Sequence, residues 1–399
     1  MERKTIQLSD VITDIAAGPF GSNLKVSCFV EDGFPIIDGA NLKGFKVTDN
    51  ITKFVTEEKA RSLHRSIAKR GDIVVTISGT LGQIAYIPKD SKYEEYLCSQ
   101  RQFRVTFDTK KVYVPYLVFY FHTYEGQHKI LSFANQVGVP ALSQPLKNFR
   151  QITIQLPTLE TQKKIANIVE SINEKIEQNE TINNNLEQQA KAIFLNEFLT
   201  LETLPDGWKQ ASLIDIADYL NGLAMQKYRP TADETGIPVL KIKELRQGCC
   251  DDNSELCSPS IKSEYIIHDG DVIFSWSGSL LVDFWCGGIC GLNQHLFKVA
   301  SNKYNKWFYY AWTKHHLDRF IAVAADKATT MGHIKRDELS KAEVLIPNEA
   351  DYKRIETLLQ PIYDLIIANR IENKKLAETR DALLPKLMSG ELDVSDIKL

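Results

Sequence analysis

Residues 156–186 read LPTLETQKKIANIVESINEKIEQNETINNNL, and residues 346–376 read IPNEADYKRIETLLQPIYDLIIANRIENKKL. At a constant offset of 190 positions, the two stretches share 8 identical residues in 31 aligned positions. A second repeat lies upstream, where GDIV in residues 71–74 corresponds to GDVI in residues 270–273, and both runs reach Ser-Gly six residues after the aspartate. The sequence therefore predicts two related units in tandem, each a β-rich segment followed by a long helix.

Apolar residues recur every three or four positions in residues 159–199 and 350–384, which predicts two long helices. About 40 residues at 1.5 Å rise give a rod of roughly 60 Å, too long to bury its narrow apolar stripe inside one small domain. Each helix is therefore expected to pack against the other as an antiparallel coiled coil. Pro361 is expected to kink the second helix or limit its first turns, and Pro385 and Gly390 are expected to end it.

The predicted fold class is α+β, with two β-rich domains related by a pseudo-twofold and joined by the helix pair. The boundaries we expect are a first β-rich domain at 1–157, a central helix at 158–200, a second domain at 201–347, and a C-terminal helix and tail at 348–399. Short β-branched runs at 73–77, 103–107 and 152–156 are predicted strands, and 114–131 is predicted to be helical.

Asn179 and Asn369 stand at the same step of each helical stripe, where an apolar residue would be expected. A buried asparagine in a coiled coil lowers stability but fixes register and orientation. The alternative is that both lie at the exposed margin of the stripe. If they fix register, replacing both with leucine should raise thermal stability and loosen the orientation of the helices.

Composition and charge limit the classes of function. The net charge is −3, but residues 1–150 hold 20 Lys+Arg and 15 Asp+Glu, hence +5. This distribution argues against strong non-specific DNA binding by the chain alone, and allows DNA binding beside a partner that supplies phosphate contacts. The chain has no run of about 18 apolar residues, and its first residues lack the apolar core of a signal peptide. Its seven cysteines at irregular spacing favour a cytoplasmic protein with free thiols.

The cysteines of the second unit also raise the question of a metal site. Cys249, Cys250, Cys257, Cys286 and Cys290 lie near His295 in the sequence, but none forms the Cys-x-x-Cys pair typical of zinc sites. We therefore expect thiols and no metal. No phosphate-binding loop, methyltransferase motif or nucleophile constellation is present in the sequence, so no cofactor and no catalytic residue are predicted.

Several motifs, in this order, resemble the DNA-specificity (S) subunit of Type I restriction-modification enzymes. They are GPFGS at 18–22, GDIV at 71–74, SGTLG at 78–82, LPTLETQKKI at 156–165, LPDGW at 204–208 and LLPKLMSGEL at 383–392. The resemblance covers the whole chain. It implies a non-catalytic subunit in a phage-defence system, with two target-recognition domains that each read one half of a bipartite, asymmetric site in double-stranded DNA.

The resemblance also implies partners. The helix pair would set the spacing of the half-sites and dock two adenine-N6 methyltransferase (M) subunits. Two motor-nuclease (R) subunits would join where the complex also cuts DNA, and the sequence leaves this open. Two other classes of function remain as alternatives: a cryptic methyltransferase, which would bind its own cofactor, and a structural scaffold, which would not bind DNA by sequence.

Polar loops at the ends of strands are the candidate DNA contacts. Arginine can read guanine, glutamine or asparagine can read adenine, and Gly-Ser-Thr loops can approach phosphates and base edges closely. The alternative for each loop is an ordinary turn or a solvated surface. The candidates in the first unit are Lys25, Lys43, Ser78, Gly79, Thr80, Arg101, Gln102, Gln136 and Ser143; those in the second are Lys241, Lys243, Ser277, Gly278, Ser279, Gln294, His295, Thr329, Thr330, His333 and Lys335.

The two units also depart from each other. The second unit has Ser277-Gly278-Ser279-Leu280-Leu281 where the first has Ser78-Gly79-Thr80-Leu81-Gly82, which puts the geometry of that loop in doubt. The second helix also lacks the Glu-x-Gln that opens the first. We therefore expect its contact with a methyltransferase to be weaker or different.

Overall fold

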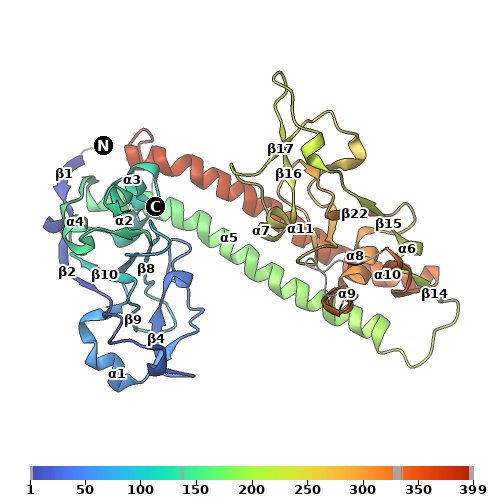
Figure 1. Cartoon of the computed structure of the whole chain (residues 1–399), viewed down its shortest axis with the longest axis horizontal. Coiled ribbons are helices and arrows are strands. Elements are labelled where there is room, and N and C mark those ends of the chain that lie inside the picture. Colours follow the sequence, from blue (N-terminus) through green and yellow to red (C-terminus); the bar gives the residue numbers. More distant parts are fainter. Residues whose placement is uncertain (1–2, 136–138, 327–333, 335, 395–399) are drawn as a thin grey trace. The chain divides into compact units, whose positions relative to one another are not determined.

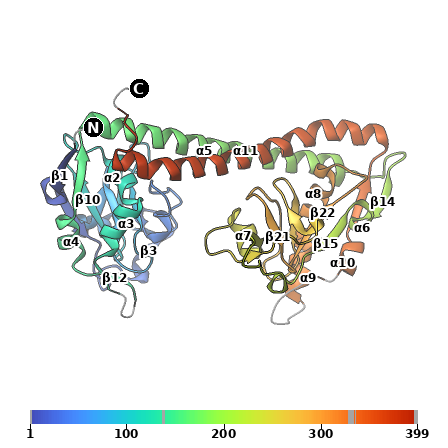
Figure 2. The same cartoon turned by 90° about the horizontal axis from the view of Figure 1, so that it is seen from above.

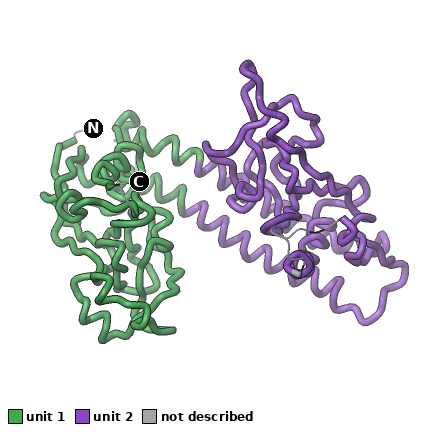
Figure 3. Tube along the Cα trace, in the orientation of Figure 1, with its two compact units in different colours: residues 1–173, 378–399 green, residues 174–377 purple. Residues whose placement is uncertain are grey.

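A computed structural model describes residues 3–135, 139–326, 334 and 336–394, which form two compact units (Figure 3). Unit 1 comprises residues 1–173 and 378–399, and unit 2 comprises residues 174–377. Each unit therefore contains a β-rich domain together with parts of both long helices. The boundary between the units falls within the helices and not at their ends.

The two units share one topology, so the sequence repeat is a structural repeat (Figure 1). In unit 1 a four-stranded antiparallel sheet has the order β2-β10-β7-β8, and in unit 2 the order β15-β22-β19-β20 is its equivalent. A second sheet, of five strands in unit 1 (β3-β5-β4-β9-β6) and four in unit 2 (β17-β16-β21-β18), contains one parallel pair, β4 with β9 or β16 with β21. A two-stranded sheet, β1-β13 or β14-β23, ties the start of each domain to its last strand.

The elements of unit 1 have the following bounds. They are β1 (Arg3–Gln7), β2 (Ile12–Ala17), β3 (Phe29–Val30), β4 (Phe34–Ile37), β5 (Phe54–Val55), α1 (Glu57–Ser62), β6 (Ile67–Lys69), β7 (Ile73–Thr76), β8 (Ile84–Tyr86), β9 (Glu95–Cys98), β10 (Gln102–Phe107), α2 (Val114–Phe121), α3 (Tyr124–Leu131), β11 (Ala134–Asn135), β12 (Ala141–Leu142), α4 (Pro145–Gln151), β13 (Thr153–Pro157) and the start of α5 (Leu159–Phe194).

Unit 2 repeats this order from the end of α5, which continues as a π-helical turn at Leu195–Leu199. Its elements are β14 (Lys209–Ser212), α6 (Leu213–Ile216), β15 (Asp218–Asn221), β16 (Ile237–Leu240), α7 (Ile242–Gln247), β17 (Leu256–Cys257), β18 (Ile266–Ile267), β19 (Val272–Ser275), β20 (Leu281–Phe284), β21 (Cys290–Leu292), β22 (Leu296–Ala300), α8 (Lys306–His315), α9 (Leu317–Asp326), α10 (Asp337–Ser340), β23 (Glu343–Ile346) and α11 (Glu349–Ser389).

The repeated Gly-Asp motif makes the turn that leads into an inner strand, β7 or β19, of each four-stranded antiparallel sheet. Gly71 and Gly270 have φ of +89° and +85°, which glycine adopts without strain. The Asp72 carboxylate accepts hydrogen bonds from the Lys69 N–H at 2.9 Å and the Thr106 hydroxyl at 2.6 Å. Burial raises the pKa of Asp72, although these hydrogen bonds and Arg104 act in the opposite direction. In unit 2, Asp271 accepts from the His268 N–H at 2.9 Å, so this repeat is structural.

The start of each long helix is attached to its domain by one buried side chain. Gln162 is fully buried; its Oε1 accepts from the Tyr113 N–H at 2.8 Å and its Nε2 donates to the Lys111 and Pro157 carbonyls. In unit 2, Tyr352 stands at the equivalent step, and its hydroxyl accepts from the Asn305 N–H at 2.9 Å. The Gln162 contacts that anchor the first helix are therefore replaced in unit 2 by a different contact inside the domain, and the weaker or different methyltransferase contact of the second helix stays a prediction.

Within unit 2 the two long helices run antiparallel (Figure 2). Four asparagines form hydrogen bonds between them. Asn179 Nδ2 donates to Asn373 Oδ1 at 2.8 Å, and Asn369 Nδ2 donates to Asn183 Oδ1 at 2.9 Å. From the first pair to the second, the position on α5 advances by one turn while the position on α11 goes back by one turn, as antiparallel helices require. The offset of 190 maps each pair onto the other, so the contacts have the pattern of a local twofold.

These four asparagines, which we call the asparagine ladder, are largely buried. Asn179 is 1% exposed, Asn183 is 6% and Asn369 is 8% exposed. Asn183 Nδ2 also donates to the Ile366 carbonyl at 3.4 Å, and Asn373 Nδ2 donates to the Ile176 carbonyl at 3.3 Å. Asn179 and Asn369 therefore do not lie at an exposed margin of the stripe.

The second long helix differs from its predicted form. α11 is continuous from Glu349 to Ser389, so Pro361 does not shorten it and Pro385 does not end it. Buried residues on both sides of each proline hold the helix in place: Leu359 and Tyr363 around the first, Leu384 and Leu387 around the second. Packing thus outweighs the hydrogen bond that each proline removes. Gly390, with φ of +83°, ends the helix, and its N–H bonds the Lys386 carbonyl at 3.1 Å.

Candidate nucleic-acid interface

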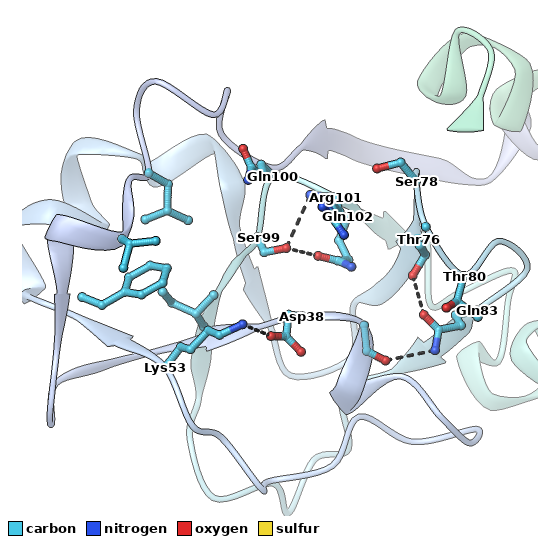
Figure 4. Close-up of a pocket in the computed structure, with 16 residues that line it drawn as sticks. Asp38, Lys53, Thr76, Ser78, Thr80, Gln83, Ser99, Gln100, Arg101 and Gln102 are labelled. Atoms are coloured by element: carbon cyan, nitrogen blue, oxygen red, sulfur yellow. Dashed lines mark hydrogen bonds and ion pairs between the residues drawn. The ribbon is translucent and has the colours of Figure 1, made fainter. Parts of the chain in front are cut away.

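In unit 1 the predicted polar loops surround a cavity of about 560 Å³ (Figure 4). One wall is the loop after β7, with Ser78, Gly79 and Thr80. Another is the turn between β9 and β10, which carries Gln100 and Arg101. These loops are far apart in the sequence. The four-stranded antiparallel sheet of unit 1 brings them together, because β7 and β10 are neighbouring strands.

The loop after β7 is held by backbone hydrogen bonds to a second predicted loop. The Gly79 N–H donates to the Pro140 carbonyl at 3.0 Å, and the Leu142 N–H donates to the Ile77 carbonyl at 2.8 Å. Gly79 has φ of +97°, which favours glycine at this position. Ser78 is half-buried, and Thr80 and Ser143 are exposed. The hydroxyls at the rim are thus presented by a fixed backbone.

Arg101 lies in a turn to which its backbone contributes hydrogen bonds and its side chain contributes none. The Ser99 hydroxyl accepts from the Arg101 N–H at 3.4 Å, and the Arg101 carbonyl accepts from the Ile77 N–H at 2.6 Å. The guanidinium is exposed and makes no hydrogen bond or ion pair within the described part of the chain. Such an arginine can donate two parallel hydrogen bonds to guanine or to a phosphate.

Gln102, in contrast, is only 2% exposed, and its Oε1 accepts from the Ser99 hydroxyl. It supports the turn and is not available to a DNA groove in this conformation. Gln83, which sequence reasoning missed, has a similar role. It accepts from the Thr76 hydroxyl at 3.0 Å and donates to the Gly39 carbonyl at 3.0 Å. Its only sequence signal was its place just before a strand.

Across the cavity, Asp38 and Lys53 form an ion pair at 2.6 Å, also missed from the sequence (Figure 4). Burial acts to raise the pKa of Asp38, but the hydrogen bonds from Lys53 and from the Ala40 N–H outweigh it and the pKa is lowered. The carboxylate is therefore ionised at neutral pH and balanced by Lys53. Arg101 then supplies a positive charge to the cavity that this pair does not cancel.

Unit 2 forms the same turn with different side chains. The His295 carbonyl accepts from the Trp276 N–H at 3.4 Å, as Arg101 does from Ile77, and Asn293 Oδ1 accepts from the His295 N–H at 3.3 Å, as Ser99 does. His295 is thus the structural counterpart of Arg101, and Gln294 that of Gln100. The counterpart of Gln102 is Leu296, which is fully buried. The sequence offered both Gln294 and His295 as candidates, and the hydrogen bonds of the turn identify His295 as the equivalent of Arg101.

The loop after β19 is shorter than its counterpart. β20 begins at Leu281, and Gly82 has no equivalent. Ser277 is 5% exposed, while Gly278 and Ser279 are exposed. The Ser279 hydroxyl accepts from Arg246 Nη1 at 3.3 Å, which adds a cation that the sequence did not single out. The two units therefore present different chemistry on the same scaffold.

The predicted lysine contacts fall into two groups. Lys25 and Lys43 are exposed. Lys241 pairs with Glu255, and Lys243 pairs with Asp251 at 3.1 Å, so acidic neighbours offset both charges. Five further predicted contacts lie outside the described residues: Gln136, Thr329, Thr330, His333 and Lys335.

The cysteines are all free thiols, and Cys98, Cys257, Cys286 and Cys290 are buried. Burial raises the pKa of the Cys98 thiol to about 12 and that of Cys286 to about 11. Among the described residues, no group of three or more His, Cys, Asp or Glu side chains could hold a metal ion. In the same part of the chain, no helix is long and apolar enough to cross a membrane.

The fold and the loops define a protein with two tandem β-rich recognition domains. The family model described as Type I restriction modification DNA specificity domain matches residues 12–188 and 205–378. The chain therefore belongs to this family: it is a Type I restriction-modification specificity subunit with two target-recognition domains.

Curated relatives agree with this assignment. The chain is 25% identical over 368 residues to the Type I restriction enzyme MjaIX specificity subunit of Methanocaldococcus jannaschii, covering 86% of this chain and 82% of that protein. It is 20% identical over 403 residues to the HindI specificity subunit of Haemophilus influenzae, covering 81% and 87%. The crystal structure of the S subunit from M. genitalium matches 99% of this chain and 97% of that one, with TM-score 0.59 and 12% identity, which supports the fold.

Proposed function

We propose that this chain is the non-catalytic, sequence-reading subunit of a DNA methyltransferase assembly, and that each unit reads one half of a bipartite site. One observation carries the proposal: Arg101 and His295 occupy the same position of the same turn in the two units. Arginine presents a planar fork of donors, whereas a neutral histidine presents one N–H donor and one acceptor, so the two turns offer different hydrogen-bonding groups to DNA. Two such domains in one chain suit a site whose halves differ in sequence.

In this proposal the helix pair sets the distance between the half-sites. α5 continues from unit 1 into unit 2, and the asparagine ladder resists sliding of α11 along it, because a shift would leave buried amides unpaired. A fixed rod between two readers fixes half-site spacing, as in dimeric DNA-binding proteins. Asn179 and Asn369 are thus proposed to set register.

The helices are also proposed to dock two adenine-N6 methyltransferase subunits and, through them, motor-nuclease subunits. Leu358 and Leu365 lie two turns apart on one face of α11 and remain 42% and 45% exposed. Exposed leucines at this spacing form a stripe that a partner helix or domain can cover. In this proposal the partner catalyses methylation, and this chain recognises the DNA sequence to be methylated.

Long-read methylation mapping tests the proposal. DNA from cells that carry this gene with its methyltransferase partner is compared with DNA from cells that lack only this gene. A bipartite adenine-methylated motif with a fixed gap, present only with the gene, is the expected result. An unchanged methylome with the partner expressed would contradict the proposal and favour a scaffold. Binding of S-adenosylmethionine by the isolated chain would favour a cryptic methyltransferase.

A further inference from the structure

An ion pair beside the candidate interface occurs in both units with its charges exchanged. In unit 1, Asp38 pairs with Lys53 at 2.6 Å. In unit 2, Lys241 pairs with Glu255. The two units thus differ in the sign of the charge at each position of the pair, provided that the positions are equivalent in the fold.

Backbone hydrogen bonds show that the positions are equivalent. In unit 1, the second-last residue of β4 donates its N–H to the Lys53 carbonyl at 3.0 Å. In unit 2, the second-last residue of β16 donates its N–H to the Glu255 carbonyl at 2.7 Å. Asp38 and Lys241 are the residues that directly follow these two strands. Asp38 therefore corresponds to Lys241, and Lys53 corresponds to Glu255.

Both pairs lie next to the turn that is proposed to read DNA. The last residue of β4 accepts, through its carbonyl, from the Ser99 N–H at 2.9 Å, and that of β16 accepts from the Asn293 N–H at 3.2 Å. Ser99 and Asn293 are the residues whose side chains hold the turn. In unit 1, Asp38, Lys53 and Arg101 line the same cavity (Figure 4).

The fold itself does not require one polarity of the pair. The side chains of Asp38 and Lys53 are 23% and 46% exposed, and ion pairs that are open to water contribute little to stability. Either polarity joins the same two segments of the sheet. What changes is the group that the position after the strand presents: a carboxylate accepts hydrogen bonds, whereas an ammonium group only donates them.

In each unit this group has capacity for a further partner. Asp38 Oδ1 accepts from the Ala40 N–H at 2.9 Å and Oδ2 accepts from Lys53, which leaves part of the about four acceptor sites of a carboxylate. In unit 2, Glu255 also pairs with Arg229 at 2.9 Å, so one carboxylate is shared by two cations. Lys241 therefore belongs to a group with a net positive charge.

We infer that Asp38 and Lys241 are specificity-determining residues at equivalent positions of the two units. Asp38 accepts a hydrogen bond from the N4 amino group of a cytosine in the half-site read by unit 1, and Lys241 donates to the O6 and N7 edge of a guanine in the other half-site. Carboxylates and lysines recognise these groups in the major groove. The inference rests on the proposed function. The competing explanation is an ion pair that only joins two segments of the sheet.

The test uses the assembled complex of this chain with its methyltransferase. Methylomes are mapped for the wild type, Asp38→Asn and Lys241→Gln. Asparagine retains an acceptor for the Ala40 N–H but carries a donor in place of the second carboxylate oxygen. Asp38→Asn should therefore lose the preference for cytosine at one position of one half-site. Lys241→Gln should relax one guanine position of the other half-site, and each variant should leave the remaining half unchanged.

Two other ion pairs provide matched controls. Glu125→Gln weakens a pair with Lys129 at 2.7 Å in unit 1, and Glu125 does not line the cavity. Lys341→Gln weakens a pair with Asp337 at 3.1 Å in unit 2. Both control variants should keep both half-sites. Size-exclusion chromatography checks that all four variants remain in the complex.

Modified DNA tests the Asp38 contact without any substitution in the protein. N4-methylcytosine still pairs with guanine, but a methyl group replaces the N–H that faces the major groove. At one cytosine of one half-site, the wild-type complex should lose at least about tenfold in affinity, the factor that corresponds to a hydrogen bond with a charged group. The Asp38→Asn complex should show no such loss.

Three outcomes would overturn the inference. They are an unchanged motif for either Asp38→Asn or Lys241→Gln, the same change of motif in a control variant, and equal affinity of the wild-type complex for normal and N4-methylated half-sites. The last measurement remains decisive if a variant fails to assemble. A wild-type methylome without a bipartite motif would instead refute the proposed function, so the two failures are distinguishable.

Discussion

Replacing members of the asparagine ladder should have opposite effects on stability, depending on how many are replaced. The single change Asn369→Leu removes the donor to Asn183 Oδ1, whose residue is 6% exposed. A buried acceptor left without its partner costs about 1–3 kcal/mol. For a unit of this size, 1 kcal/mol shifts Tm by about 2–4 °C. With a loss of about 2 kcal/mol, we expect Asn369→Leu to lower the Tm of unit 2 by about 4–8 °C.

Replacing all four asparagines with leucine removes donors and acceptors together. No orphaned amide then remains in the ladder, and an apolar seam replaces a polar one, a change that is often neutral or stabilising. We expect the Tm of the quadruple variant to equal or exceed that of the wild type. The double change Asn179→Leu with Asn369→Leu is different, because Asn373 and Asn183 would each lose a partner. The rise in stability expected from the sequence for that double change is therefore replaced by a fall.

Differential scanning calorimetry measures these stabilities, and methylome mapping measures the consequence for function. The methyltransferase complex that contains the quadruple variant should methylate sites with more than one gap length between the half-sites, because the register of the two helices is no longer fixed. The reasoning is refuted if the four substitutions destabilise additively, or if the quadruple variant keeps one gap length at unchanged affinity. A double-mutant cycle on Asn183 and Asn369 isolates their pairwise contribution.

Three further predictions concern reading, folding and pH. Arg101→Ala should relax one position of one half-site by about 1–3 kcal/mol in binding measurements, and Arg101→Lys should not restore it if the contact is bidentate; equal binding by the wild type and Arg101→Ala would exclude the residue. Gly18→Ala should lower the Tm of unit 1, because its Cβ would overlap the Ser99 carbonyl, whereas Gly44→Ala, with no atom within 4 Å, should not; similar melting of both variants would contradict this. Burial lowers the pKa of His316 to about 4, despite its hydrogen bond to the Glu343 carbonyl, from an ordinary value near 6.5. The unfolded state then binds the extra proton, so unit 2 should lose stability as pH falls from about 7 to 4; His316→Gln should flatten this part of the Tm profile, and an unchanged slope would assign it to other groups.

The repeated architecture could be predicted because it follows from periodic sequence patterns, namely the helical spacing of apolar residues and motifs that occur in both units. The helical stripes and the Gly-Asp turns recur in sequence, and both are confirmed as repeated elements of an α+β fold. The lengths of helices were harder to predict, since a local rule for proline competes with distant contacts. Packing of Leu359 and Tyr363 decides the outcome at Pro361, and neither contact is visible in a window of sequence.

The candidate site was predictable by region and not by residue. The predicted ends of strands gave the positions of the loops. Within one loop, however, Arg101 is exposed and Gln102 is buried, and no local sequence signal distinguishes these two neighbours. The pairing of Asp38 with Lys53 depends on three-dimensional proximity, because β4 and β5 are neighbours in the five-stranded sheet. Likewise, the hydrogen bonds of the turn, and not the sequence, identify His295 as the counterpart of Arg101.

The turn that carries Arg101 has a consequence for how this chain can evolve. In unit 1 the shape of the turn is set by backbone hydrogen bonds and by the side chain of Ser99, while the Arg101 side chain at the tip makes no hydrogen bond or ion pair within the described part of the chain. Under the proposed function, substitutions of Arg101 therefore change the DNA target and leave the fold of the turn nearly unaffected. A lineage can drift between recognition sequences one substitution at a time, and the protein remains folded at every intermediate step.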